Sequence, residues 1–358
     1  MNDPLFSEFK LGRITLNNRV VMSPMTRSRA INNIPNDIMA EYYKQRASAG
    51  LLITEGVSPS PNGLGYARIP GIFNHEQSLG WRKVTQAVHG KDGRIFLQLM
   101  HTGRVSHPLN MPPGSKVIAP SAIGMTGEMW TDQKQMQPYP VPREMTLDDI
   151  RNAVNEYAQG CRNAIEAGFD GVELHGANGY LIEQFINPSP NHRTDQYGGS
   201  APNRISFAVE VAKASAQAIG GDRVGMRVSP YGVFNDTGLY DGIDETYALL
   251  SEELGKIGLV YMHIVDHSSM GAPAVSPAVK ATIRKKFKGA VILSGGYDAD
   301  SAGRDLGENK GDLVAFGRPF IANPNLVEKL RKKAPLNIPD QATFYTPGEK
   351  GYTDYPLD

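Results

Sequence analysis

Short apolar segments recur along the whole chain, and each one ends in glycine, proline or polar residues. They are rich in β-branched side chains, which favour strands. They occupy residues 19–24, 51–56, 95–100, 171–175, 224–229, 260–265, 290–295 and 313–318. The pattern predicts eight buried strands.

Segments with helical periodicity separate these strands. After Thr146 and Asp149, which match a helix-capping pair, apolar residues recur at spacings of three and four from Ile150 onward. Further helices are expected to begin at Ser200, with a proline in the first turn, after Asp298, and near Pro324. Strands that alternate with helices pair in parallel, so eight such units predict an α/β fold, a closed (β/α)8 TIM barrel.

A doubly wound sheet is the alternative architecture. It is disfavoured because no Gly-x-Gly-x-x-Gly follows the first strand and the strand–helix repeats do not reverse. Residues 5–18 precede the first strand and are expected to form a short hairpin over the bottom of the barrel. No segment has the composition of a linker, so residues 1–358 are expected to form a single barrel domain.

Two segments do not fit a minimal barrel. Residues 104–143 are rich in Pro, Met and Gly and form a long excursion after the third strand, on the face where barrel enzymes have their active sites. Residues 335–358 are rich in Pro and Tyr and are expected to pack as an irregular cover.

Composition excludes several classes of function. The chain has 358 residues, of which 40% are hydrophobic and 21% charged, and its formal net charge is zero, so no basic surface for nucleic acid or an anionic membrane is indicated. No apolar run approaches the ~20 residues that span a bilayer, and no signal peptide is recognisable, which predicts a cytoplasmic protein. The single Cys161 excludes an internal disulfide and a four-cysteine zinc or iron–sulfur site.

Polar side chains follow nearly every predicted strand. In a barrel, residues at the carboxyl ends of the strands converge on the active site, and seven polar residues there are hard to explain as packing. They are Thr26, Glu55, Gln98, His175, Arg227, Ser294 and Arg318.

The fourth strand has the most informative end. Within six residues it places His175, Asn178 and Tyr180, which are two hydrogen-bond donors and a phenol. Such a set can hold a substrate oxygen and supply a proton. The loops after the last two strands contain Gly295, Gly296 and Gly317 beside Arg318, and barrels bind phosphate at these two loops.

Several blocks of the chain resemble the Old Yellow Enzyme family, flavin-dependent reductases of activated double bonds, and most closely its bacterial members that act on N-ethylmaleimide and pentaerythritol tetranitrate. These blocks are residues 23–27, 98–104, 171–200, 227–230, 315–318 and 351–356. The resemblance implies bound FMN, NADPH or NADH as the reductant, and enones, nitro compounds or nitrate esters as substrates. It implies hydride transfer to the β carbon of the substrate.

The resemblance also implies residue roles. His175 and Asn178 would hold the substrate's electron-withdrawing group, Tyr180 would donate a proton, and Tyr66, Met100 and Tyr345 would line the substrate pocket. Met100 departs from the Trp of the nearest relatives. The flavin ring would contact Pro24, Thr26, Gly56, Gln98 and Arg227, and its phosphate Ser294, Gly295, Gly296, Gly317 and Arg318.

Two other functions compete with this one. A metal-dependent hydrolase on the same barrel could use His175, His263, Asp266 and His267, but the first strand has no His-x-His, so no metal is expected. A ligand-binding barrel without catalysis has no feature in its favour. The physiological substrate, the choice between NADPH and NADH and the oligomeric state stay open.

Overall fold

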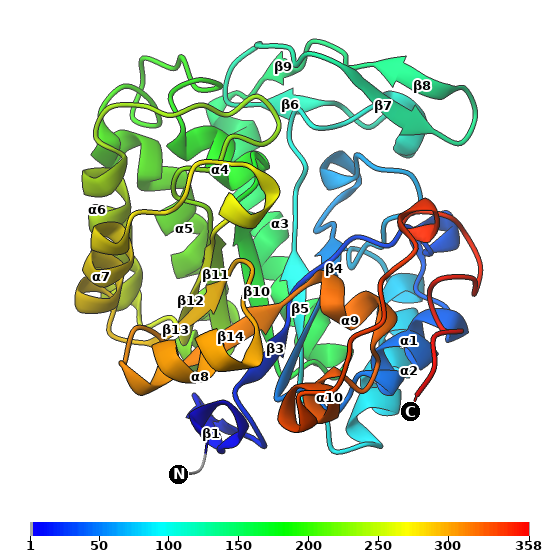
Figure 1. Ribbon diagram of the computed structural model, residues 1–358. Helices are drawn as coiled ribbons and strands as arrows, with labels where there is room; N and C mark the ends of the chain where they lie inside the picture. The colour runs from blue at the N-terminus through cyan, green and yellow to red at the C-terminus, as the bar shows by residue number, and fades with distance from the viewer. Residues whose placement is uncertain (1–2, 358) are drawn as a thin grey trace.

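The computed structural model describes residues 3–357 and shows a closed barrel of eight parallel strands, as the sequence predicts (Figure 1). Around the barrel the strands follow the order β10-β11-β12-β13-β14-β3-β4-β5. Their bounds are β3 (Val20–Met22), β4 (Leu51–Val57), β5 (Ile95–Leu99), β10 (Gly171–Gly176), β11 (Val224–Val228), β12 (Tyr261–Val265), β13 (Ala290–Ser294) and β14 (Leu313–Phe316).

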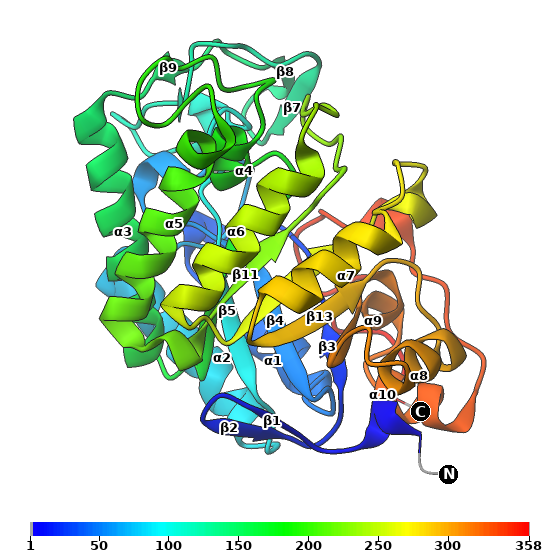
Figure 2. The ribbon, with the colours of Figure 1, turned by 90° about the vertical axis from the view of Figure 1, so that its left-hand side faces the viewer.

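Helices surround the barrel, and Figure 2 shows α3, α5 and α6 side by side on its outer surface. The helices are α1 (Asp37–Gln45), α2 (His75–His89), α3 (Leu147–Glu166), α4 (Leu181–Ile186), α5 (Ala201–Ile219), α6 (Ile243–Ile257), α7 (Pro277–Lys286), α8 (Ala299–Gly307), α9 (Arg318–Ala322) and α10 (Leu326–Lys332). The predicted cap of α3 is confirmed: Thr146 N–H donates to Asp149 at 2.7 Å, and Asp149 N–H donates to Thr146 Oγ1 at 3.1 Å. The predicted starts at Ser200, Asp298 and Pro324 match α5, α8 and α10 to within two residues.

The lower half of the barrel interior is apolar. Strands β1 (Phe9–Leu11) and β2 (Ile14–Leu16) form the predicted hairpin, and Leu11 and Leu16 close the bottom of the barrel against Phe96 and Tyr261. The ring of Tyr261 lies where a side chain at Gly225 would be, 2.3 Å from an added Cβ. Aromatic rings therefore fill the barrel because glycines on neighbouring strands leave them room.

The excursion after β5 lies over the carboxyl ends of the strands, above the barrel in Figure 1. It contains β6 (Ile118–Ala119), β7 (Glu128–Thr131) and β8 (Gln135–Pro138), and β9 (Arg143–Glu144) ends it. Strands β7 and β8 pair as an antiparallel hairpin. The sequence predicted the excursion but not its strands, because each is four residues or shorter and most of the side chains of this hairpin are exposed.

The C-terminal tail forms the irregular cover that the sequence predicts. From residue 335 to residue 357 its one regular element is a 3-10 turn at Gln341–Thr343. The fully buried Arg29 donates hydrogen bonds to four carbonyl oxygens of the tail, those of Thr343, Phe344, Gly348 and Lys350. Arg27 adds hydrogen bonds to the carbonyl oxygens of Phe344 and Gly351, so buried guanidinium groups hold the tail against the barrel.

We expect Arg29→Met to loosen the tail and to lower the free energy of unfolding by about 2–4 kcal/mol, because the buried carbonyl oxygen of Thr343 would lose its donor, at a cost of about 1–3 kcal/mol, and three partly buried hydrogen bonds would be lost as well. Faster hydrogen exchange confined to residues 340–352 would show the local effect. The control is Arg94→Met, since the side chain of Arg94 is partly exposed and bonds only to carbonyls one and two residues away. Equal stability of the two variants would contradict the role of Arg29.

Candidate active site

Two connected cavities open at the carboxyl ends of the strands, with volumes of about 870 and 680 Å³. The first lies under the β7–β8 hairpin, and the second lies over the loops that follow β13 and β14. They share the lining residues Pro24, Thr26, Tyr66, Asn178, Tyr180, Arg227, Gln341 and Tyr345. The barrel mouth is therefore one elongated site with two ends.

A polar layer forms the floor of this site. The carboxylate of Glu173, on β10, accepts hydrogen bonds from Gln98 Nε2 at 2.8 Å and Tyr261 Oη at 3.1 Å, and His263 Nδ1 lies 2.9 Å from it. Burial works against ionisation, but His263, Arg227 and Gln98 together hold the pKa of Glu173 below its usual range. Burial also lowers the pKa of His263, so we assign a hydrogen bond from a neutral imidazole to a carboxylate.

Strand register brings the next residues of this layer together. His175 pairs with Arg227 across β10 and β11, and Arg227 pairs with His263 across β11 and β12. Arg227 is 7% exposed, and its Nε has no hydrogen-bond partner among the described residues. Arg227 lines both cavities and forms no hydrogen bond or ion pair within residues 3–357, so its guanidinium can bind a ligand acceptor there.

The end of β10 and the turn that follows it present the three residues of the predicted catalytic set: His175 lies in the strand, and Asn178 and Tyr180 lie in the turn. Asn178 and Gly179 adopt left-handed backbone conformations, with φ of 61° and 75°, which Asn tolerates and Gly favours. A side chain at Gly179 would meet the carbonyl oxygen of Phe234 at 2.6 Å. Tyr180 then becomes the N-cap residue of α4, with its ring edge-on to that of His175 at 5.0 Å. Two tight backbone positions therefore turn the chain so that three side chains reach one cavity.

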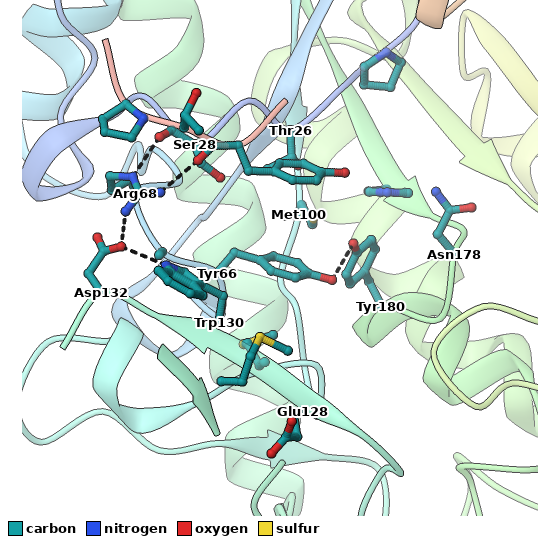
Figure 3. Close-up of a pocket in the computed structure, with 18 of the residues that line it drawn as sticks. Thr26, Ser28, Tyr66, Arg68, Met100, Glu128, Trp130, Asp132, Asn178 and Tyr180 are labelled. Atoms are coloured by element: carbon teal, nitrogen blue, oxygen red, sulfur yellow. Dashed lines mark hydrogen bonds and ion pairs between the residues drawn. The ribbon is translucent and has the colours of Figure 1, made fainter. Parts of the chain in front are cut away.

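Electrostatics keep His175 and Tyr180 neutral. Burial first, and then the charge of Arg227, hold the pKa of His175 well below its usual range, and its Nδ1 has no partner in the described part of the chain. Burial raises the pKa of Tyr180 to about 12, while a hydrogen bond with Tyr66 acts in the opposite direction. The two hydroxyl oxygens are 3.0 Å apart (Figure 3). At neutral pH the site thus offers a neutral imidazole and a protonated phenol.

Most of the predicted site residues line the two cavities. Those that line the first cavity are Pro24, Thr26, Tyr66, Gln98, Met100, His175, Asn178, Tyr180, Arg227 and Tyr345. Those that line the second, besides the shared residues, are Ser294, Gly295, Gly296, Gly317 and Arg318. Gly56 lines neither cavity, because the Met100 side chain covers it: a Cβ added at Gly56 would lie 2.5 Å from Met100 Sδ.

Glu55 was wrongly predicted to converge with the other strand-end residues. Leu51 and Ile53 point into the barrel, and strict alternation would point Glu55 there too. The register between β4 and β5 shifts between Ile53 and Gly56, and this bulge moves Glu55 to another face. Its carboxylate accepts the N–H of Arg27 at 3.3 Å, and burial raises its pKa to about 7.

The second cavity has the features expected for a phosphate site. Gly295 has a φ of 129°, and a Cβ there would lie 2.3 Å from the carbonyl oxygen of Asp266, so only glycine fits. Arg318 forms no ion pair within the described chain. The Arg318 guanidinium suits the phosphate of the predicted flavin, and the Arg227 guanidinium, which lines both cavities, suits its ring.

The outer wall of the site was not predicted. Arg68 donates to the carbonyl oxygens of Ser28 at 3.0 Å and Tyr345 at 2.8 Å and pairs with Asp132 of the hairpin loop, which joins three segments around the cavity mouth (Figure 3). Trp130 lies beside this cluster and is half-exposed. The sequence around Trp130 has no strand periodicity. The grouping of Arg68, Asp132 and Trp130 could therefore be found only from their contacts in the folded chain.

The metal-hydrolase alternative gains no support. In residues 3–357 no group of three or more His, Cys, Asp or Glu side chains could hold a metal ion. Three of its candidate ligands bond elsewhere: His263 to Glu173, Asp266 to Lys280 and His267 to Asn178. Across the same residues, every helix is too short or too polar to cross a membrane.

Comparison with known proteins identifies the family. A sequence model of the NADH:flavin oxidoreductase / NADH oxidase family matches residues 4–337. The 12-oxophytodienoate reductase 7 of Oryza sativa subsp. japonica is 40% identical over 99% of this chain and 94% of its own length. A probable flavin mononucleotide-dependent alkene reductase of Leishmania infantum is 42% identical over 99% of this chain and 98% of its own.

Solved structures agree with these matches. Morphinone reductase superposes with a TM-score of 0.95 at 43% identity, covering 99% of this chain and 96% of that one, and it has also been solved in complex with tetrahydroNAD. The Old Yellow Enzyme homologue from Zymomonas mobilis gives a TM-score of 0.93 at 39% identity, covering 98% and 99% of the two chains. The chain therefore belongs to the NADH:flavin oxidoreductase / NADH oxidase family and, within it, to the Old Yellow Enzymes, FMN-dependent alkene reductases that use NAD(P)H.

Proposed function

We propose that this protein reduces the carbon–carbon double bond of α,β-unsaturated carbonyl and nitro compounds. The observation that supports this most is the convergence of His175, Asn178 and Tyr180 on one cavity that Arg227 and Gln98 also line. Arg227 and Arg318 line the cavities that would hold FMN, which would supply hydride transfer from NAD(P)H to the β carbon of the substrate. The overall reaction adds this hydride and one proton across the double bond.

His175 and Asn178 bind the substrate's carbonyl or nitro oxygen. His175 is neutral and can donate one N–H, and the Asn178 amide nitrogen can donate another. Two fixed donors withdraw electron density from the conjugated double bond, and they stabilise the negative charge that reaches the oxygen as hydride adds. The His175 ring packs edge-on against the Tyr180 ring, and Asn178 Oδ1 contacts His267, so both side chains are positioned before the substrate arrives.

Tyr180 protonates the α carbon. Its raised pKa, about 12, keeps the proton on the phenol until the carbanion forms. Tyr66 Oη, 3.0 Å away, can then donate to the oxygen of Tyr180 and stabilise the phenolate that is left. The hydrogen bond between the Tyr66 and Tyr180 hydroxyls therefore lets Tyr180 give up its proton and be protonated again through Tyr66.

NAD(P)H and the substrate use the same cavity in turn. No Gly-x-Gly-x-x-Gly motif for a separate nicotinamide domain follows the first strand. The nicotinamide must therefore leave before the alkene binds over the flavin, which gives ping-pong kinetics. A bulky substrate would extend toward Trp130 and Met136, which are half-exposed at the mouth of the first cavity.

The experiment that tests this function is Tyr180→Phe in the FMN-loaded enzyme. Reduction of cyclohexenone by the pre-reduced variant should slow by roughly 10²–10⁴-fold, the usual contribution of a positioned general acid, while flavin reduction by NADPH stays close to that of the unmodified enzyme. Stopped-flow absorbance of the flavin measures the two half-reactions separately.

Tyr66→Phe is the matched control, because it removes the neighbouring hydroxyl and leaves that of Tyr180. It should slow cyclohexenone reduction by about tenfold, the value of one hydrogen bond. Unchanged alkene reduction in Tyr180→Phe would show that another group supplies the proton. Equal slowing of both half-reactions would show a general disturbance of the pocket.

Arg227→Ala should lower the reduction potential of bound FMN by about 30–60 mV, because a charge-assisted hydrogen bond of about 1.5–3 kcal/mol to the anionic reduced ring is lost. It should also weaken FMN retention. Dye-coupled reductive titration measures the potential, and Arg94→Ala, which changes a partly exposed arginine that lines neither cavity, is the control. A variant that keeps its full FMN content and potential would contradict a role of Arg227 at the ring.

Met100→Trp should shift the substrate preference toward smaller enones, since Met100 lines the first cavity and its 1% exposure leaves no free space behind it. Relative rates and product enantiomers over a panel of substituted cyclohexenones measure the shift. Met136→Trp enlarges a side chain at the outer rim instead and should change only the rates of long substrates. Identical profiles for Met100→Trp and the unmodified enzyme would remove Met100 from the substrate pocket.

A further inference from the structure

Asn178 is held on three sides by groups that the proposed chemistry does not use. Its backbone N–H donates to Ser229 Oγ at 2.9 Å, and its carbonyl oxygen accepts from Asn235 Nδ2 at 2.7 Å. Ser229 is in turn bonded to both carboxylate oxygens of the buried Glu183, at 2.8 and 2.9 Å. The backbone of Asn178 is therefore fixed, and only its side-chain amide is left to be oriented.

The third contact reaches that amide. His267 Nε2 lies 2.8 Å from Asn178 Oδ1, and the His267 ring is fixed edge-on against Phe234, with 4.5 Å between ring centroids. Figure 3 shows the nitrogen of the Asn178 amide turned toward the cavity and its oxygen turned away. The amide could rotate by half a turn with little change in shape, so its orientation depends on its hydrogen-bond partners.

We propose that His267 is a positioning residue that sets the orientation of the Asn178 amide: its Nε2–H donates to Asn178 Oδ1, so that Asn178 Nδ2 faces the substrate oxygen. This inference rests on the proposed function, because it explains how Asn178 comes to be a donor. Without this contact the amide could present its oxygen instead, and two oxygens would then repel each other at the point where substrate binds.

The charges around His267 favour this arrangement. Burial lowers the pKa of His267 to about 4, helped by Arg227 and Arg318 and opposed by Asp266, so the ring is neutral at pH 7 and carries one proton. The carboxylate of Asp266 is engaged with Lys280 at 2.6 Å and with the N–H of Ser268 at 3.0 Å. The Asn178 oxygen is the one acceptor bonded to the His267 ring within residues 3–357.

The opposite assignment makes a different prediction. If the proton of His267 were on Nδ1, Nε2 would accept from Asn178 Nδ2, and Asn178 Oδ1 would face the cavity. An acceptor at position 267 would then support the native orientation as well as histidine does. Replacements that can only accept, or that can also donate, therefore distinguish the two assignments.

The test compares His267→Gln with His267→Glu, which introduce two side chains of nearly equal size. The probe is phenol, whose ionised oxygen needs donors, titrated into the FMN-loaded protein and followed by the absorbance change of the flavin. Gln can donate to Asn178 Oδ1 and should keep the affinity within about threefold. Glu can only accept, so it should turn the amide and weaken phenol binding on the order of 10- to 100-fold.

The same pair of substitutions in an Asn178→Ala background separates orientation from charge. The negative charge that His267→Glu introduces would repel phenolate whether or not Asn178 is present, whereas the orientation effect requires the amide. We expect the ratio of phenol affinities between the Gln and Glu variants to shrink about fivefold or more in this background. FMN content and thermal unfolding of each variant confirm that the folded holoenzyme is compared.

Three results would count against the inference. Equal phenol affinity of His267→Gln and His267→Glu would overturn it, and so would an undiminished difference in the Asn178→Ala background. Phenol binding that is absent from the unmodified, FMN-loaded protein would overturn the proposed function together with the inference. If the unmodified protein binds phenol and the two His267 variants bind it equally well, the proposed function stands and only the role of His267 is contradicted.

Discussion

The site depends on a buried positive charge that the barrel must accommodate. Arg227 is almost fully buried, and a lone charge in a low-dielectric interior would cost several kcal/mol. Glu173 compensates for it, and Gln98, Tyr261 and His263 satisfy the Glu173 carboxylate in turn. The mutual support of this layer lets a cationic group stand at the floor of the cavity, where the negative charge of a reduced ring would be stabilised.

The same charge affects two histidines at the site, His175 and His267. Arg227 adds to the effect of burial on His175 and His267 and keeps both imidazoles neutral. A neutral His267 has one proton to place, and a neutral His175 can donate one N–H without carrying a full charge into the pocket. The charge of Arg227, which lies on β11, thus influences the groups beside Asn178 and Tyr180, which lie in the turn after β10.

The polar groups of the site and the walls that enclose it come from different parts of the chain. The strand ends supply the polar groups, on rigid elements, whereas the β7–β8 hairpin and the C-terminal tail supply the walls. Arg68 joins the hairpin and the tail, and Arg29 holds the tail by its carbonyl oxygens. Side chains on the walls can change the shape of the mouth without touching the reacting end, which is a physical basis for variation in substrate size on a fixed chemistry.

Periodicity along the chain and residue types at strand ends, which are local properties, are enough to predict the eight strands, the parallel barrel and the bottom hairpin. The set His175, Asn178 and Tyr180 is predicted because it lies in a block that resembles the Old Yellow Enzyme family. The side of the strand on which Glu55 lies could be known only from the folded chain, because a one-residue bulge reverses the face of a strand without a clear mark in the sequence. The contact of His267 with Asn178 joins residues 89 positions apart, and so depended on how two loops meet. The outer wall formed by Arg68, Asp132 and Trp130 also depends on long-range packing. Hydrophobic periodicity along the chain contains no information about such contacts.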